Sequence, residues 1–177
     1  MEKTVVIYKS KHGSTKKYAE WIGEELCCPV IAEADFSKKD FDKYENVIFG
    51  GCVQAGGIMG FDIIRKSMRR LQGKKLVVFA VGLNVMQKET RMQLREINFG
   101  KRKLSGITCY YCPGAYDPDK IHGIDSGIMK MMVKMLESKK PIDTTEEDRK
   151  LLEHVKNGVD MTDRKYIEPI VSEFKYD

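Results

Sequence analysis

Short runs of consecutive apolar residues recur along this chain, and they constrain its fold more than any other feature. The clearest are Val5, Val6 and Ile7, then residues 47–49 and residues 76–81. A strand with one face in water alternates apolar and polar residues, whereas a strand that is apolar throughout is buried on both faces. Such runs are typical of a parallel sheet that is covered on both sides by helices.

Helical periodicity fills the segments between these runs. We predict strands at residues 4–8, 29–34, 46–51, 75–81 and 106–112. We predict helices at residues 14–26 and 61–71, in the first half of 86–103, and at residues 124–136 and 144–155. Strands that alternate with helices form an open parallel sheet, and five strands favour the order 2-1-3-4-5. The predicted fold class is therefore a three-layer α/β sandwich with helices on both faces.

Length and composition favour one domain in a reducing compartment. The chain has 177 residues, of which we assign 1–157 to the domain and 158–177 to a polar tail that packs on it or extends from it. No apolar run approaches the roughly 20 residues that span a bilayer, and the amino-terminal run is too short for a signal peptide. Five cysteines, an odd number, are typical of reducing conditions. We expect a cytoplasmic protein.

Cys109 and Cys112 form a CxxC pair, which invites a redox or zinc interpretation. The pair lies in a predicted strand, where residues three apart point to opposite faces. The two sulfurs therefore cannot readily share a metal or a disulfide, and no second Cys or His pair with ligand spacing completes a site. We interpret both as core cysteines and predict no metal site.

A loop rich in hydroxyl side chains joins the first predicted strand to the first helix. Helix amino termini present unpaired N–H groups and partial positive charge, so they bind phosphate well. Gly13 lets the backbone approach a ligand closely, while Ser10, Ser14 and Thr15 add hydroxyl donors and His12 adds a ring N–H. The segment has neither a Walker lysine nor a GxGxxG, so it favours a single monophosphate. The alternative is a hydroxyl helix cap without a ligand.

The same segment resembles the flavodoxin signature. The matching positions are Val6, Ile7, Tyr8, Ser10, Gly13, Thr15, Ala19 and Ile22. The resemblance covers residues 3–157 and implies non-covalent FMN, with its phosphate at this loop and its ring between the loops after the third and fourth strands. Those loops contain Cys52, Val53, Gln54, Ala55, Gly56 and Gly57, and then Gly82, Leu83 and Asn84. The alternative interpretation of the glycine-rich first loop is a flexible turn.

Neither of these loops carries an aromatic side chain that would stack on a flavin ring. Trp21, the only tryptophan, lies on the first helix, away from the predicted ring. Tyr116 follows the fifth strand and is the candidate for stacking, although it also suits a simple turn. His122 lies in the next loop, where a substrate would approach. Tyr116 and His122 are the candidate catalytic residues.

Weaker, compositional features are similar to the bacterial protoporphyrinogen IX dehydrogenase (quinone) branch of the flavodoxin superfamily. They are the basic insert at residues 86–103, the Gly114-Ala115-Tyr116 turn and the methionine-rich helix at 128–136. This resemblance implies oxidation of protoporphyrinogen IX with a quinone as acceptor. A methionine-rich helix otherwise favours plain core filling, which we consider the better interpretation.

The net charge of +5 is concentrated after the two predicted flavin loops. The basic residues are Arg65, Lys66, Arg69, Arg70, Lys74 and Lys75, then Lys88, Arg91, Arg95, Lys101, Arg102 and Lys103. These segments are solvated helix faces, or else a surface for a carboxylate-bearing substrate, an acidic redox partner or the anionic inner face of a membrane. No nucleic-acid reader motif accompanies them. Because carrier flavodoxins are characteristically acidic, we favour an FMN-dependent oxidoreductase over an electron carrier, and a flavin-sensing interaction module least.

Overall fold

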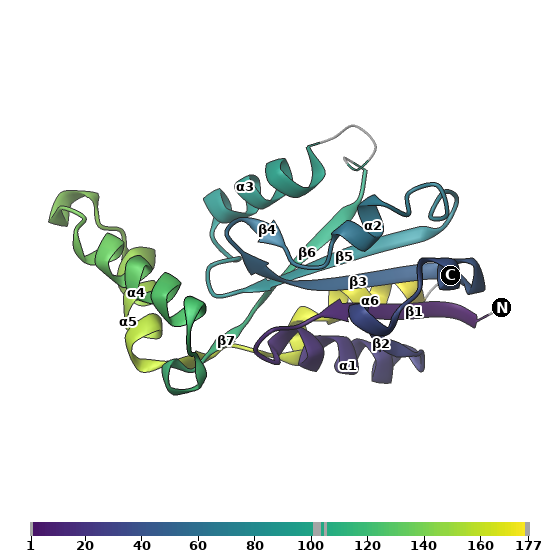
Figure 1. Cartoon of the computed structure of the whole chain (residues 1–177), viewed down its shortest axis with the longest axis horizontal. Coiled ribbons are helices and arrows are strands. Elements are labelled where there is room, and N and C mark those ends of the chain that lie inside the picture. Colours follow the sequence, from purple (N-terminus) through teal and green to yellow (C-terminus); the bar gives the residue numbers. More distant parts are fainter. Residues whose placement is uncertain (1, 101–103, 105, 176–177) are drawn as a thin grey trace.

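Five parallel strands form the centre of the molecule (Figure 1). The computed structural model of the chain describes residues 2–100, 104 and 106–175. The strands are β1 (Glu2–Lys9), β2 (Val30–Ala32), β3 (Tyr44–Gln54), β5 (Lys75–Gly82) and β6 (Thr108–Pro113). Their order is β2-β1-β3-β5-β6, and a short strand β4 (Gly57–Ile58) pairs with β3 in the antiparallel sense. The predicted order 2-1-3-4-5 is confirmed, since β5 and β6 are the fourth and fifth predicted strands.

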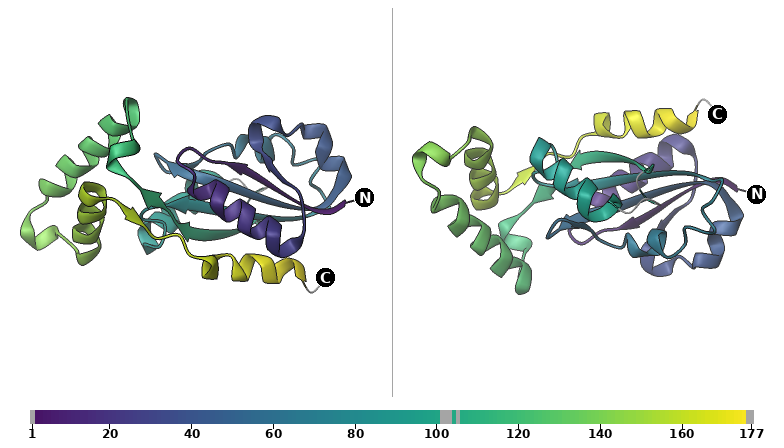
Figure 2. Two further views of the ribbon diagram at one scale, coloured as in Figure 1. Left: turned by 90° about the horizontal axis from the view of Figure 1, so that it is seen from below. Right: turned by 90° about the horizontal axis from the view of Figure 1, so that it is seen from above.

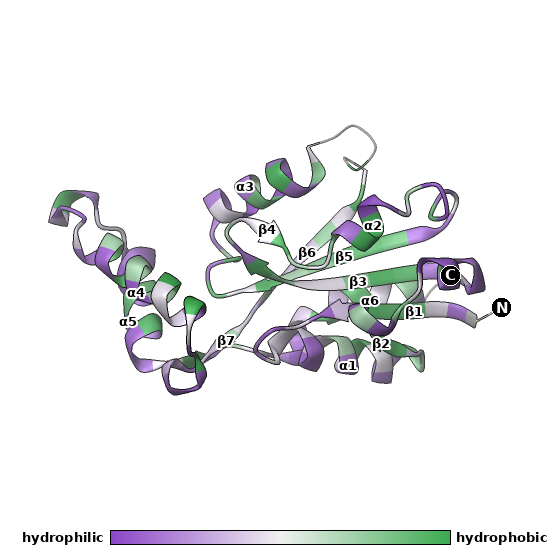
Figure 3. Cartoon of the chain, in the orientation of Figure 1, coloured by the Kyte–Doolittle hydropathy of each residue, from purple (hydrophilic) through white to green (hydrophobic). Residues whose placement is uncertain are grey.

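The apolar runs lie side by side at the middle of this sheet. Val6 pairs with Ile48 in β3, and Ile48 pairs with Val77 in β5. All three side chains are almost fully buried, as expected for strands covered on both faces. Colouring by hydropathy shows the same concentration of hydrophobic residues along β3 and β5 (Figure 3).

Helices cover both faces of the sheet. The α-helices are α1 (Ser14–Leu26), α2 (Asp62–Arg65), α3 (Lys88–Phe99), α4 (Ile124–Glu137), α5 (Glu146–Asn157) and α6 (Glu168–Lys175). Short 3₁₀ turns are η1 (Glu33–Asp35), η2 (Lys38–Lys43), η3 (Pro118–Lys120), η4 (Pro141–Asp143) and η5 (Arg164–Tyr166). One core joins α1 and α6 to the sheet, and the other joins η2, α2 and α3 to the opposite face (Figure 2). The predicted three-layer α/β sandwich is confirmed.

The predicted helix at residues 61–71 is wrong in its conformation, although its buried face is right. Only Asp62–Arg65 is α-helical, and tighter turns follow, such as the bond from the Ser67 amide to the Ile64 carbonyl at 3.0 Å. Turns with an i to i−3 hydrogen bond repeat every three residues. A bond from the Leu71 amide to the Ser67 carbonyl, four residues back, follows, and Phe61, Ile64 and Leu71 all lie in the core.

Residues 158–175 contribute to the core. A short strand β8 (Val159–Asp160) pairs with β7 (Ala115–Tyr116), and α6 then runs along the sheet beside α1 (Figure 2). Ile167, Ile170, Val171 and Phe174 are buried there, at helical spacing. The segment that we expected to be a polar tail thus supplies a helix of the sandwich.

Helices α4 and α5 pack on each other and extend beyond the sheet as a helical hairpin (Figures 1 and 2). Thr145 and Asp148 form a capping box at the start of α5. The interpretation of the methionine-rich helix as core filling is wrong, because Met131 is 66% exposed and Met135 is 57% exposed. Because α4 packs on α5 and not on the sheet, only one of its faces is buried, and the methionines on the other faces are exposed.

Cys109 and Cys112 belong to opposite faces of β6, as predicted. Cys109 packs against the α2–α3 core and Cys112 lies within the α1–α6 core. Burial raises the pKa of each thiol to about 12. Within the described residues, no helix is long and apolar enough to cross a membrane.

Candidate functional site

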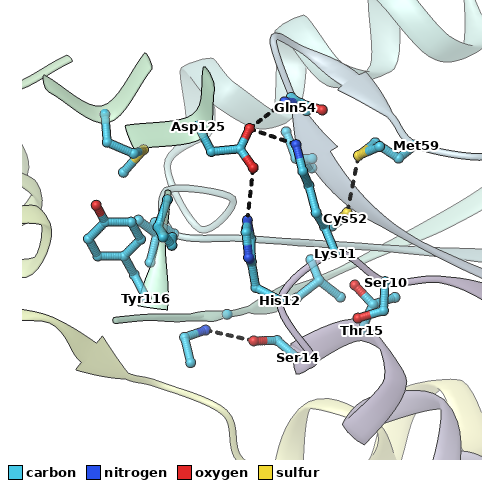
Figure 4. A pocket seen from close by; sticks show the side chains of 18 of the residues that line it. Ser10, Lys11, His12, Ser14, Thr15, Cys52, Gln54, Met59, Tyr116 and Asp125 are labelled. Carbon is cyan, nitrogen blue, oxygen red and sulfur yellow. Dashed lines mark hydrogen bonds and ion pairs between the residues drawn. The ribbon is translucent and has the colours of Figure 1, made fainter. Parts of the chain in front are cut away.

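A cavity of about 200 Å³ lies where the parallel strands end. The loops that follow β1, β3, β5 and β6 line it, and α4 closes one side (Figure 4). In open α/β sheets, ligands bind at this edge, beside the point where the strand order reverses. Here that point lies between β1 and β3, since β2 lies on the far side of β1.

Most of the residues predicted from the sequence line this cavity. They are Ser10, His12, Ser14, Thr15, Cys52, Val53, Gln54, Ala55, Gly82, Leu83 and Tyr116. Five others do not line it, namely Gly13, Gly56, Gly57, Asn84 and His122. Of these, His122 is exposed in the turn before α4. Gly13, Gly56 and Gly57 instead shape the loops that carry their neighbours.

The start of α1 has the features of an anion site. Gly13 is its N-cap residue, so no side chain caps the helix, and the first turn carries no acidic residue. The φ of Gly13 is 96°, a conformation that favours glycine, and its amide donates to Ser10 Oγ at 3.1 Å. The next amides of the first turn lack an intrahelical acceptor, as in every helix. This helix therefore presents uncompensated N–H groups to the cavity.

Two hydroxyl side chains complete the loop. Ser14 Oγ accepts a hydrogen bond from the Ala115 amide at 3.0 Å, which ties the loop to β7 and leaves the hydroxyl hydrogen for another acceptor. Thr15 is 1% exposed, and its Oγ1 has no hydrogen-bond partner among the described residues. Roughly 90% or more of buried polar groups are hydrogen-bonded. The Thr15 hydroxyl thus indicates a missing acceptor.

Asp125, at the start of α4, holds the loop to the helical hairpin (Figure 4). Its carboxylate accepts from Lys11 Nζ at 2.6 Å and from Gln54 Nε2 at 3.3 Å, and it lies 3.5 Å from His12 Nε2. Asp125 was missed at the level of the sequence because an acidic residue in a first helical turn ordinarily compensates the helix dipole. It also lies more than a hundred positions from Lys11.

The loop after β3 is a defined hairpin and not a flexible turn. Gln54 pairs with Gly57 across it, and Ala55 and Gly56 have φ values of 48° and 77°. These values suit a two-residue hairpin turn of type I′. Asn98 of α3, 2% exposed, accepts from the Ile58 amide and donates to the Gly56 carbonyl, both at 3.0 Å.

Asn98 was also missed, although one signal was available. Asparagine is unfavourable in a helix interior, so a buried asparagine there usually has a partner to hold.

Cys52 of β3 lines the cavity beside this hairpin, and its sulfur lies 3.4 Å from Met59 Sδ. Burial raises the pKa of the Cys52 thiol, so this group stays neutral beside the cavity.

Tyr116 borders the cavity on the β7 side, and burial raises its pKa. It also lines a second, more polar cavity that adjoins the first at Lys11 and His12 and is walled by Asp117 and Asp160. Among the described residues, Tyr116 is the only one besides His12 that lines the first cavity with an aromatic ring. Trp21 lies elsewhere, with Lys17 and Arg164 over its ring.

The basic segments lie outside both cavities as far as the structure describes them. Several of their cations are bound within the protein: Arg70 pairs with Asp42, Lys74 donates to the Tyr44 carbonyl, and Arg91 donates to the Val85 carbonyl. Residues 101–103 of the second segment lie outside the described residues. Lys11 is instead the cation that borders the first cavity.

Several solved flavodoxin structures are similar to this chain. A WrbA-like flavodoxin from Agrobacterium tumefaciens is 18% identical over 64% of this chain and 84% of that chain, with a TM-score of 0.49. Flavodoxin 2 from Bacillus cereus is 14% identical over 86% and 94%, with a TM-score of 0.49. A Fusobacterium nucleatum flavodoxin mutant bound to flavin mononucleotide is 16% identical over 69% and 74%, with a TM-score of 0.41. No curated protein sequence matches the chain significantly.

The family model described as a flavodoxin domain matches residues 5–143, which include β1, the loop before α1 and the strands of the sheet up to β6. The match extends through α4 but ends before α5 and α6. The chain therefore belongs to the flavodoxin domain family.

Proposed function

We propose that the chain binds FMN non-covalently in the first cavity and works as an FMN-dependent oxidoreductase. The observation that carries the proposal is the uncapped start of α1 with the buried, unpartnered Thr15 hydroxyl. The helix amides and the Thr15 hydroxyl are all hydrogen-bond donors, and an anion at the loop formed by residues 10–15 would accept from them. A terminal phosphate supplies that acceptor, with oxygens for the helix amides and for several hydroxyl groups at once.

The residues present fit such a phosphate. Ser10, Ser14 and Thr15 each have a hydroxyl hydrogen to donate, and Lys11 adds positive charge to the lining of the cavity. A Cβ built on Gly13 would meet no atom within 4 Å, so the space beside this residue is open. Gly13 therefore contributes in two ways: it adopts a positive φ that favours glycine, and it leaves space for a ligand beside the loop.

The rest of the cavity suits a flat ring held at its edges. Its volume of about 200 Å³ is below the roughly 300–1,000 Å³ of sites that enclose a ligand fully, so a flavin would project from it. The 54–57 hairpin and the loop starting at Gly82 would hold the ring, and Tyr116 would border one side. When bound, FMN supplies one- or two-electron transfer chemistry. The chain's own residues hold it, orient it and keep one side of it dry.

An apolar reduced substrate suits this site best. Ile128, Met129 and Met132 of α4 line the cavity, so the approach to the ring is largely aliphatic and contains thioethers. Met side chains adapt to flat or irregular ligands. Together with the resemblance to the porphyrinogen-oxidising branch, this favours protoporphyrinogen IX or a similar reduced aromatic, with a quinone as acceptor. Lys11 would then be the nearest cation for a substrate carboxylate.

An anionic membrane surface is the proposed partner beyond the small molecules. Helix α4 exposes Ile124, Ile128, Met131 and Met135, which fall on one helical stripe that meets the cavity at Ile128. Lys130 and Lys134 lie beside that stripe, as in helices that rest in a bilayer interface. The two basic segments considered above are the weaker surface, because several of their cations are already paired.

The decisive experiment combines flavin binding with anaerobic turnover. Protein reconstituted with FMN should show bound-flavin absorbance, and FAD should not replace it. Turnover is then measured with protoporphyrinogen IX and a soluble menaquinone analogue. Tyr116→Ala should lose most turnover and keep flavin, while His122→Ala should lose less because His122 lies outside the cavity. Absence of porphyrin formation, together with fast electron exchange with a ferredoxin-type partner, would identify an electron carrier instead.

A further inference from the structure

Asp125 places a carboxylate at the cation-bearing side of the phosphate loop. Its side chain is 17% exposed and lies against Lys11, His12 and Gln54 at the distances given above. Lys9, on the other side of Ser10, is already paired with Glu33 at 3.3 Å. Lys11 is thus the lysine of this loop that is turned toward the cavity, and Asp125 neutralises it (Figure 4).

An anion bound at residues 10–15 would share neighbours with this carboxylate, because Lys11 and His12 belong to the same loop. Both would draw on Lys11 and on the ring N–H of His12, and like charges in a partly buried site repel each other. The same carboxylate is the polar link between α4 and the loops after β1 and β3. Occupation of the loop and closure of the helical hairpin are therefore linked through one side chain.

We propose that Asp125 competes internally with the phosphate of FMN, so that phosphate binding displaces it from Lys11 and His12 and releases the start of α4. The inference rests on the proposed function, since it takes the loop at residues 10–15 to be the phosphate site. Asp125 lowers the affinity for the phosphorylated ligand and in return fastens the hairpin over the empty cavity. It is a positioning residue, because it acts through Lys11 and the hairpin.

The test compares FMN with riboflavin, which has the same ring and no phosphate. Dissociation constants for both are measured by quenching of flavin fluorescence with apo wild-type protein, Asp125→Asn and Asp125→Ala. Removing the carboxylate should tighten FMN binding about tenfold or more, since a like charge near the phosphate is lost. Riboflavin binding should change by less than about twofold. Asp143→Asn is the matched control, because it removes the same charge from an exposed position at the far end of the same hairpin.

The outcomes distinguish failure of the competition by Asp125 from failure of the proposed FMN binding. If neither variant binds FMN more tightly than the wild type, Asp125 does not compete with phosphate. An equal gain for FMN and riboflavin would also overturn the inference, because the carboxylate would then act by closing the cavity and not against the phosphate. If neither flavin binds the wild type, the control or the two Asp125 variants, the proposed function itself fails. A preferential gain for FMN in both Asp125 variants, absent from the control, is the expected result.

Discussion

Thr15 connects folding and ligand binding through one hydroxyl group. We expect Thr15→Val to weaken FMN binding by about 1.5–3 kcal/mol, the contribution of a hydrogen bond to a charged group. The same change should raise the stability of the apo protein by about 1 kcal/mol, because it removes a buried hydroxyl without a partner. Ser67→Ala is the matched control: among the described residues Ser67 Oγ is the other buried hydroxyl without a partner, and it does not line the cavity.

The apo stabilities follow from chemical denaturation and the affinities from flavin titration. Thr15 would not contact the phosphate if Thr15→Val and Ser67→Ala left FMN affinity equally unchanged.

The buried thiol of Cys112 makes stability depend on alkaline pH. Burial raises its pKa in the folded protein to about 12, above the ordinary value of 9.0, so the unfolded chain loses this proton first as pH rises. The free energy of unfolding should therefore decline from about pH 9 upward, by up to about 1.4 kcal/mol per pH unit for this group. Denaturant titrations between pH 8 and pH 11 should give a shallower decline for Cys112→Ala. Equal slopes would mean that other groups dominate.

Among the elements, the β3–β4 hairpin depends on a helix that is far from it in sequence. Asn98→Ala removes both the acceptor for the Ile58 amide and the donor to the Gly56 carbonyl. We expect faster hydrogen exchange at residues 54–58 and weaker binding of FMN and riboflavin alike, because the hairpin holds the ring and not the phosphate. This pattern differs from that of Thr15→Val, which should affect FMN alone. Unchanged exchange in the hairpin would contradict the role of Asn98.

The exposed stripe of α4 should govern association with membranes. Met131→Glu with Met135→Glu should reduce sedimentation with vesicles that contain anionic lipid, since both side chains are more than half exposed. Met92→Glu is the control, because Met92 is 63% exposed on α3, away from the stripe. Binding should also weaken with salt, given a screening length of about 10 Å at 0.1 M ionic strength. If none of the proteins binds vesicles, α4 has no such partner.

The sequence predicts an element well when the residues that determine it are close together in the chain, and poorly when they are far apart. The strands and α1 follow from apolar runs and helical spacing, so residues 14–26 were predicted as observed. The spacing of Ile124, Ile128 and Met131 looks the same whether a helix packs on a sheet or faces solvent. Asp125 and Asn98 act on residues more than thirty positions away, and no periodicity reports such contacts.

The whole molecule depends on its carboxyl-terminal helix. Ile170 is fully buried between α6 and the sheet, so Ile170→Ala should lower the free energy of unfolding by about 2–5 kcal/mol. Ser172→Ala, at an exposed position of the same helix, should cost less than about 1 kcal/mol. Urea titration measures both. The sequence hides this helix because its eight residues are too few for helical periodicity to be recognised. Similar losses for the two variants would mean that α6 is not part of the cooperative unit.

The helical hairpin leaves and rejoins the sandwich at a single point. Ala115 pairs with Asp160 and Tyr116 with Val159, so the chain departs and returns through two adjacent strands (Figure 1). The helices between them thus join the sandwich through a narrow base of two paired strands. Exchange of these helices for others would change what reaches the cavity while the sheet, the loop at residues 10–15 and α6 keep their places. New substrate specificity is thus open to this fold by replacing one contiguous stretch of the gene.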